Sequence, residues 1–169
     1  MNSAFIALGG NLGDVKQTFQ TACDALKETC NIIAISKLYH TPALTMPNSD
    51  PQPDYWNAAI HVHTQLPAPT LLAELHRIEA LHHRKRIEHW GSRTLDLDLI
   101  TYEQRISTQA DLKLPHPETQ SRLFVLQPLM DIAPFWVHPV TGESLSTMIT
   151  NLTDAGEKLH KGEAWQLQH

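Results

Sequence analysis

The 169-residue chain is poor in cysteine and has no long hydrophobic run. Its two cysteines, Cys23 and Cys30, stand seven positions apart without companion metal ligands, a pattern typical of reduced thiols rather than a disulfide framework. The apolar stretch near the N-terminus, residues 4–8, is too short for a signal-peptide core or a membrane helix. These absences predict a cytoplasmic protein that does not contact a membrane, with Cys23 as part of the core.

Internal repeats, low-complexity segments and linkers rich in glycine and serine are also absent, so nothing marks an internal domain boundary. A chain of 169 residues with 41% hydrophobic content is long enough to bury one substantial core. We therefore predict a single domain over residues 1–169, with the tail from 158 onward loosely held.

Positive charge is scarce overall but concentrated in one segment. The net charge of −5 argues against a broad nucleic-acid-binding face, which owes its affinity to clustered lysine and arginine. Yet five of the thirteen basic residues fall between positions 77 and 93: Arg77, Arg84, Lys85, Arg86 and Arg93. This local positive site favours a small polyanion as the partner, rather than nucleic acid.

Two carboxylates follow the basic segment at a spacing of two. In residues 95–100, Asp96 and Asp98 alternate with leucines, and the side-chain period of a strand places both acids on one face. Their mutual repulsion would be relieved by a divalent cation, and Mg²⁺ prefers oxygen ligands. A solvated strand edge is the simpler interpretation of such a pair, but the neighbouring arginines favour metal-assisted chemistry on phosphate.

Hydrophobic periodicity and turn residues predict the order of the secondary structure. The expected strands are 5–8, 32–39, 55–64 and 95–100, and the expected helices follow Asp14, span 71–81 and span 120–131. The order strand, helix, strand, strand, helix, strand is typical of a split βαβ unit. We predict an α+β, ferredoxin-like antiparallel sheet with helices packed on it, and a long, proline-rich functional loop over residues 40–54.

Several motifs together resemble the 6-hydroxymethyl-7,8-dihydropterin pyrophosphokinases, enzymes of folate biosynthesis that move a pyrophosphoryl group from ATP to a pterin alcohol. They are ALGGNLGD at 7–14, YHTP at 39–42, PDYWNA at 53–58, WGSRTLDLD at 90–98, and LPHP at 114–117 followed by Arg122, Phe124 and a Pro-Leu pair at 128–129. The glycine run at 9–13 has neither the phosphate-loop nor the dinucleotide-binding spacing and is weak evidence alone.

The resemblance implies roles for individual residues. Asp96 and Asp98 would hold two Mg²⁺ ions that bridge the ATP phosphates, and Arg84 and Arg86 would be loop arginines that stabilise the reacting phosphate, with Lys85 as the alternative in register. The implied catalytic group is Arg84, Arg86, Arg93, Asp96 and Asp98. The implied ATP-binding residues are Glu79, Trp90, Arg93, Leu99, His116 and Arg122. The implied pterin-binding residues are Thr41, Pro42, Leu44, Tyr55, Asn57, Trp90 and Phe124.

In the implied reaction the pterin hydroxymethyl oxygen attacks the β-phosphorus of ATP, and AMP leaves. Such transfer depends on positioning and electrostatic stabilisation, so the lack of a Ser/His/Asp triad is no objection. Asp96 is the one candidate for a general base, although metal binding would keep its basicity low. The resemblance also implies a monomer.

Three other hypotheses remain open at this point. A two-metal nuclease or phosphohydrolase could use the same aspartates with water as the nucleophile. A ferredoxin-like binding module would take up a small ligand without Mg²⁺-dependent turnover. His61 and His63 share a strand face and could belong to a transition-metal site, although no cysteine or HExxH pattern accompanies them.

Overall fold

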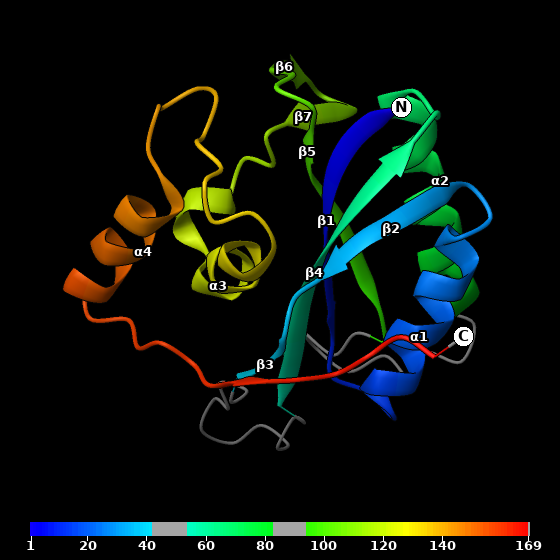
Figure 1. Cartoon of the computed structure of the whole chain (residues 1–169), viewed down its shortest axis with the longest axis horizontal. Helices are drawn as coiled ribbons and strands as arrows, with labels where there is room; N and C mark the ends of the chain where they lie inside the picture. Colours follow the sequence, from blue (N-terminus) through cyan, green and yellow to red (C-terminus); the bar gives the residue numbers. More distant parts are fainter. Residues whose placement is uncertain (42–53, 83–93, 169) are drawn as a thin grey trace.

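The computed structural model describes residues 1–41, 54–82 and 94–168 (Figure 1). It combines helices with a six-stranded sheet in the order β5-β1-β4-β3-β8, in which β2 also pairs with β4, and the paired strands are antiparallel. The sheet strands are β1 (Asn2–Gly10), β2 (Cys30–Ile35), β3 (Leu38–Thr41), β4 (Tyr55–Thr64), β5 (Asp96–Tyr102) and β8 (Gly162–Glu163). A separate hairpin contains β6 (Ser107–Gln109) and β7 (Leu112–Leu114).

Helices cover both faces of the sheet, as Figure 1 shows. They are α1 (Val15–Leu26), α2 (Ala68–His82), α3 (Leu123–Ile132) and α4 (Leu145–Asp154), with a 3₁₀ turn at Thr119–Ser121. The larger core joins one sheet face to α1 and α2, and the smaller core joins the other face to α3 and α4. In the described ranges, every helix is too short or too polar to cross a bilayer.

The sequence pattern of the first helix is confirmed by its packing. The Asp14 carboxylate accepts the backbone N–H of Gln17 at 3.2 Å, which satisfies one of the free donors at the helix start. The apolar face predicted for this helix is buried throughout: Val15, Phe19, Ala22, Cys23 and Leu26. Burial also raises the pKa of the Cys23 thiol to about 12, so this cysteine is an unreactive core residue.

Of the strands predicted at 55–64 and 32–39, the structure confirms the first and corrects the second. Strand β4 has the predicted bounds, and Ala58, Ile60 and Val62 lie together in the larger core. The prediction of a single strand over 32–39 is wrong, because the chain leaves the sheet ladder at Ser36 and forms two strands, β2 and β3. The Ser36 hydroxyl accepts the N–H of Ala59 at 2.8 Å and donates to the carbonyl of Lys37 at 2.7 Å, which breaks the backbone ladder locally.

Two further helix expectations need correction. The helix predicted at 120–131 is a 3₁₀ turn followed by α3, because Arg122 between them has an extended backbone with φ −122° and ψ 101°. Leu81, predicted on the apolar face of the second helix, is 44% exposed, whereas Leu75 and Ile78 of the same helix are buried.

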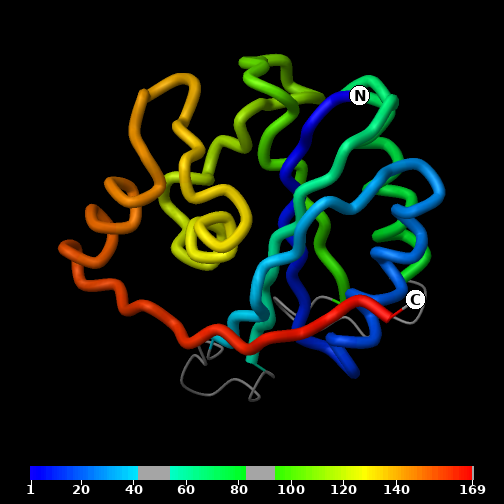
Figure 2. Tube along the Cα trace, viewed as in Figure 1, coloured from blue at the N-terminus to red at the C-terminus, as the bar shows by residue number. Residues whose placement is uncertain are grey.

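The C-terminal tail was expected to be loosely held, but the structure attaches it to the sheet. Residues Gly162–Glu163 form β8 against β3, where the red end of the trace passes the cyan segment (Figure 2). Trp165 packs against the larger core. The contacts of the partly buried Trp165 and Leu167 with the core, and the added strand pairing of β8, explain the attachment. These contacts join distant segments and follow from no local pattern in the sequence.

Candidate active site

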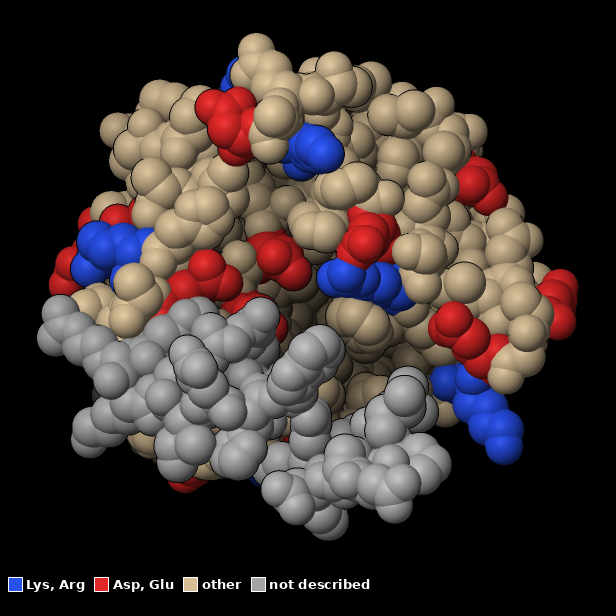
Figure 3. Space-filling model, turned by 180° about the vertical axis from the view of Figure 1, so that it is seen from behind, with Lys and Arg blue, Asp and Glu red and all other residues tan. Residues whose placement is uncertain are grey.

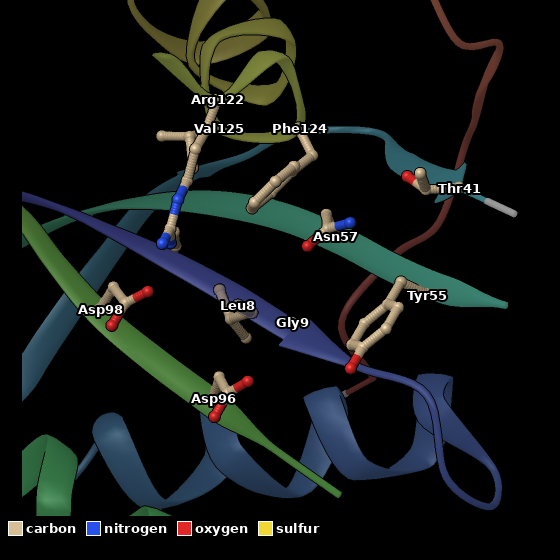
Figure 4. A pocket seen from close by; sticks show the side chains of 11 residues that line it. Leu8, Gly9, Thr41, Tyr55, Asn57, Asp96, Asp98, Arg122, Phe124 and Val125 are labelled. Carbon is tan, nitrogen blue, oxygen red and sulfur yellow. The ribbon is translucent and has the colours of Figure 1, made fainter. Parts of the chain in front are cut away.

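A cavity of about 560 Å³ opens where β1, β4 and β5 face α3. Its wall contains Ala7, Leu8, Gly9, Thr41, Tyr55, Asn57, Asp96, Asp98, Arg122, Phe124 and Val125 (Figure 4). In the space-filling view, acidic and basic side chains gather around a hollow in this face of the molecule (Figure 3). Aromatic and amide groups line one part of the cavity, and carboxylates line another.

The carboxylates come from β5, as the alternating pattern predicts. Asp96 and Asp98 pair in register with Gly9 and Ala7 of β1, and both acids line the same cavity. The intervening Leu97 is 2% exposed and packs on the opposite face. The prediction that the two aspartates share one face is therefore confirmed.

The aromatic part of the cavity lies between β4 and α3. Tyr55 and Asn57 project from the same face of β4, and Phe124 reaches toward them from the first turn of α3 (Figure 4). Phe124 is 37% exposed and lines the cavity, so part of its ring is open to solvent. A flat ring could therefore enter between the two aromatic side chains.

The Asn57 amide depends on the glycine across the ladder. Asn57 is 8% exposed and is paired in register with Gly9 of β1. A Cβ atom at Gly9 would lie 3.1 Å from Asn57 Oδ1, so a larger residue would crowd the amide. This close approach gives a physical reason for one glycine of the N-terminal motif.

Thr41 contributes a polar group with unused hydrogen-bonding capacity. Among the described residues, its Oγ1 is the buried side-chain oxygen or nitrogen that has no hydrogen-bond partner. Thr41 ends β3 and lines the cavity. Since buried polar groups are nearly always paired, this hydroxyl is suited to bind a ligand atom.

Arg122 places a positive charge in the same cavity. It precedes α3, forms an ion pair with Glu118, and its guanidinium carbon lies 5.6 Å from the centre of the Phe124 ring. The close-up shows its side chain extending from α3 toward the strands (Figure 4). A polyanion held at Asp98 by a cation would thus meet a fixed guanidinium.

A second cavity of about 280 Å³ adjoins the first, and Asp98 lines both. Its other lining residues are Leu72, His76, Leu97, Leu99, Ala110, Asp111, Leu112, Lys113, Leu114, His116 and Pro117. Of the predicted ATP-binding residues, Leu99 and His116 lie here, whereas Arg122 lies in the first cavity. The sequence did not single out His76 or Lys113, because neither belongs to a local motif.

The electrostatic surroundings of His116 favour its neutral form. Burial lowers the pKa of His116, and the nearby Arg122 lowers it further, while Asp98 acts in the opposite direction. The neutral ring keeps one acceptor nitrogen, and its Nδ1 accepts the N–H of Glu118 at 3.3 Å.

Glu79 of α2 is connected to the site by a hydrogen bond with the backbone of β5. Its Oε2 accepts the N–H of Leu97, the residue between the two aspartates, at 2.8 Å. Burial raises the pKa of Glu79, and the negative charges of Asp96 and Asp98 raise it further against the opposing effect of the Leu97 hydrogen bond. The structure therefore gives this carboxylate a visible contact with the strand that carries both acids.

Several predicted site residues lie outside the described residues: Pro42, Leu44, Arg84, Arg86, Trp90 and Arg93. In the described part of the chain, no group of three or more histidine, cysteine or acidic residues is arranged to hold a metal ion. His61 and His63 do lie together, with ring centres 5.2 Å apart, but without a third such ligand in that part.

Comparison with known proteins now identifies the family. The family model for 7,8-dihydro-6-hydroxymethylpterin-pyrophosphokinase (HPPK) matches residues 5–134. The chain belongs to the HPPK family. It is therefore a pyrophosphokinase of folate biosynthesis, which sets aside the nuclease and binding-module hypotheses.

Relatives from bacteria support the HPPK assignment. The chain is 42% identical over 150 residues to the 2-amino-4-hydroxy-6-hydroxymethyldihydropteridine pyrophosphokinase of Synechocystis sp., covering 88% of this chain and 75% of that protein. It is 38% identical over 141 residues to the enzyme of the same name from Haemophilus influenzae, covering 82% and 86%.

A solved HPPK-DHPS structure from Plasmodium falciparum has a similar fold, with a TM-score of 0.71 at 14% identity. The match covers 90% of this chain but 44% of that one, so the HPPK-like part spans less than half of the solved chain. At this identity the likeness supports the mixed helix and antiparallel-sheet fold alone.

Proposed function

We propose that this HPPK transfers the pyrophosphoryl group of ATP to the hydroxymethyl oxygen of 6-hydroxymethyl-7,8-dihydropterin, releasing AMP. One observation carries the proposal: a single cavity holds an aromatic and amide part suited to a heterocycle and a carboxylate part suited to metal-bound phosphate. Its volume of about 560 Å³ is within the range of small-molecule sites.

The pterin ring would stack between Tyr55 and Phe124. Aromatic stacking combines a large apolar contact with a preferred geometry, which suits a flat bicyclic ring. The Asn57 amide offers a donor and an acceptor to the ring edge, and the Thr41 hydroxyl, which has no hydrogen-bond partner among the described residues, would find one there. Pro42, Leu44 and Trp90 remain predicted pterin contacts outside the described residues.

ATP would occupy the second cavity and extend its phosphates into the first. The shared residue Asp98 marks the junction, Leu99 and His116 line the part proposed for the nucleoside, and Arg122 lies where the phosphates would pass. Glu79, predicted as an ATP contact, is proposed to act chiefly by holding Leu97 and with it the backbone of β5. Trp90 and Arg93 remain predicted contacts outside the described residues.

The donor set fits Mg²⁺. Asp96 and Asp98 offer hard carboxylate oxygens, and Mg²⁺ in phosphoryl-transfer sites commonly uses one or two carboxylates together with substrate phosphates and water. Such a site needs no cluster of three protein ligands. When bound, the metal would neutralise charge on the transferred phosphates, and we propose two ions, both held by these aspartates.

The protein residues would act by orientation and charge. Stacking at Tyr55 and Phe124 would hold the hydroxymethyl oxygen toward the carboxylate part of the cavity, so the oxygen could attack the β-phosphorus while the bond to the α-phosphate oxygen breaks. Arg122, and the predicted Arg84, Arg86 and Arg93, would stabilise charge on the phosphates. Asp96 remains the candidate to accept the hydroxyl proton.

We also propose a classification and a cellular setting. The strand order β5-β1-β4-β2 corresponds to the 4-1-3-2 order of a ferredoxin-like sheet, and it supports that assignment. We propose that residues 1–169 form one domain that acts as a monomer in the cytoplasm, where the two free, buried cysteines would stay reduced.

Product analysis tests the proposed function. The full chain is mixed with ATP, Mg²⁺ and 6-hydroxymethyl-7,8-dihydropterin, and nucleotides and pterins are separated, with controls that omit pterin or metal. We expect AMP and a pterin diphosphate in equal amounts. Neither product should form in the control without pterin or in the control without metal. ADP, or phosphate released without pterin, would contradict the proposal.

A further inference from the structure

The C-terminal strap, defined here as residues 158–168, lies beyond the matched family region at 5–134. It leaves α4, passes α3 and β3, and ends beside α1 (Figures 1 and 2). The strap therefore contacts the two elements that carry Phe124 and Thr41, on either side of the proposed pterin site.

The strap is attached to α3 by a reciprocal pair of hydrogen bonds. The His160 N–H donates to Gln127 Oε1 at 2.9 Å, and Gln127 Nε2 donates to the carbonyl of His160 at 3.1 Å. Gln127 lies three residues after Phe124, so both side chains belong to adjacent turns of one helix. The pair fixes the strap to the helix that presents the stacking ring.

The next residues of the strap extend the sheet at β3. In β8, Gly162 pairs with Tyr39 and Glu163 pairs with Leu38. A Cβ atom at Gly162 would lie 2.7 Å from Cδ and 2.9 Å from Cβ of Lys37, and 3.1 Å from Cζ of Tyr39. The strap can lie this close to β3 because position 162 has no side chain.

The same strand is bound directly to α3. Tyr39 donates its hydroxyl hydrogen to Asp131 Oδ2 at 2.8 Å, and the Lys37 N–H donates to the same oxygen at 3.0 Å. Asp131 is in the last turn of α3, and Tyr39 is two residues before Thr41. Strand β3 and helix α3 are therefore joined in two ways: directly through Asp131, and through the strap, which contacts both.

The end of the strap is anchored on α1 and at the break between β2 and β3. Trp165 donates its indole N–H to the carbonyl of Ser36 at 2.7 Å, and its ring centre lies 6.2 Å from that of Phe19. Gln168 and Gln20 exchange two hydrogen bonds, at 2.8 and 3.2 Å. These contacts hold the strap at both ends of its path across β3.

We propose that the C-terminal strap is a positioning element for the pterin part of the site, because it fixes β3, which carries Thr41, relative to α3, which carries Phe124. This inference rests on the proposed function. Among the described residues, the hydrogen bonds and strand pairs of the strap join it to α3, β3, α1 and Ser36, and none of these partners lines the second cavity. Its release should therefore weaken pterin binding while leaving nucleotide binding intact.

The test compares three full-length variants with the wild type. Gly162→Val places a side chain against Lys37 and Tyr39, and Trp165→Ala removes the anchor at Ser36. Ala164→Val is the matched control, because it adds bulk at an exposed position of the same segment. Amide hydrogen exchange over residues 158–168 reports release of the strap, and steady-state kinetics give separate KM values for pterin and ATP.

For Gly162→Val and Trp165→Ala we expect faster exchange in the strap, a pterin KM raised about tenfold, and an ATP KM within about twofold of the wild type. Ala164→Val should match the wild type in all three. An unchanged pterin KM with faster exchange, an equal rise in both KM values, or unchanged exchange in both test variants would overturn the proposal. A wrong proposed function would give a different result: the wild type itself would show no pterin-dependent turnover.

Discussion

The unpaired hydroxyl of Thr41 allows a prediction in which stability and binding change in opposite directions. Its Oγ1 is buried and has no hydrogen-bond partner in residues 1–41, 54–82 and 94–168, and an unsatisfied buried polar group costs roughly 1–3 kcal/mol. Thr41→Val removes that group while keeping the β-branched shape suited to the end of β3. We expect the free energy of unfolding of the unligated protein to rise by about 1 kcal/mol.

The same change should impair recognition of the pterin. If the hydroxyl binds the ring edge, Thr41→Val loses one hydrogen bond in the complex, and the dissociation constant for pterin should rise about tenfold, which is 1.4 kcal/mol. Urea denaturation measures the free energy of unfolding, and isothermal titration calorimetry measures pterin binding. Binding of an ATP analogue should stay within about twofold, because Thr41 does not line the second cavity.

A matched control is available in the same sheet. Thr64 is fully buried, but its hydroxyl donates to the carbonyl of Thr29 at 2.9 Å and accepts the N–H of Leu66 at 3.1 Å. Thr64→Val should therefore lower the free energy of unfolding by about 2 kcal/mol and leave pterin binding unchanged. The reasoning is refuted if Thr41→Val destabilises the protein as Thr64→Val does, or if it leaves pterin affinity unaltered.

The remaining predictions concern the metal site, stacking, strand support and pH. Asp98→Asn should reduce turnover at least about 100-fold with the thermal unfolding temperature preserved, and near-normal turnover would exclude Asp98 as a ligand. Tyr55→Ala should weaken pterin binding about tenfold or more and ATP binding little, as two parallel titrations can show; equal losses would argue against stacking. Glu79→Ala should lower the free energy of unfolding by about 2 kcal/mol because it leaves the Leu97 N–H unpaired, whereas Glu79→Gln keeps an acceptor and should lose less. Burial lowers the pKa of His138 below its ordinary 6.5, so the unfolded chain takes up the proton first as the pH falls. The contribution of neutral His138 to the free energy of unfolding should therefore be complete above pH 6.5 and decline below it. NMR titration of the ring checks the pKa, and denaturation at several pH values checks the free energy of unfolding.

Residues with a strong local pattern were predicted correctly. The helix after Asp14, the bounds of β4 and the shared face of Asp96 and Asp98 all follow from side-chain period and capping chemistry, which depend on neighbours in the chain. The break at Ser36 was missed because it depends on a hydrogen bond to Ala59, 23 residues away. The secure attachment of the C-terminal tail was missed for the same reason.

The sequence by itself determined the alternation that turns both aspartates to one side of a strand, the core face of the first helix and, through its separated motifs, the family. Only the tertiary structure decided that Tyr55, Phe124 and Asn57 line the same cavity as Asp96 and Asp98, and that Asp98 also borders a second cavity. It alone shows that Glu79 accepts a hydrogen bond from Leu97 and that the Thr41 hydroxyl has no partner in the part of the chain that the structure describes. The physical reason is one of range: periodicity and capping act over a few residues, whereas a cavity and an unpaired buried group depend on which distant segments the packed sheet and helices bring together.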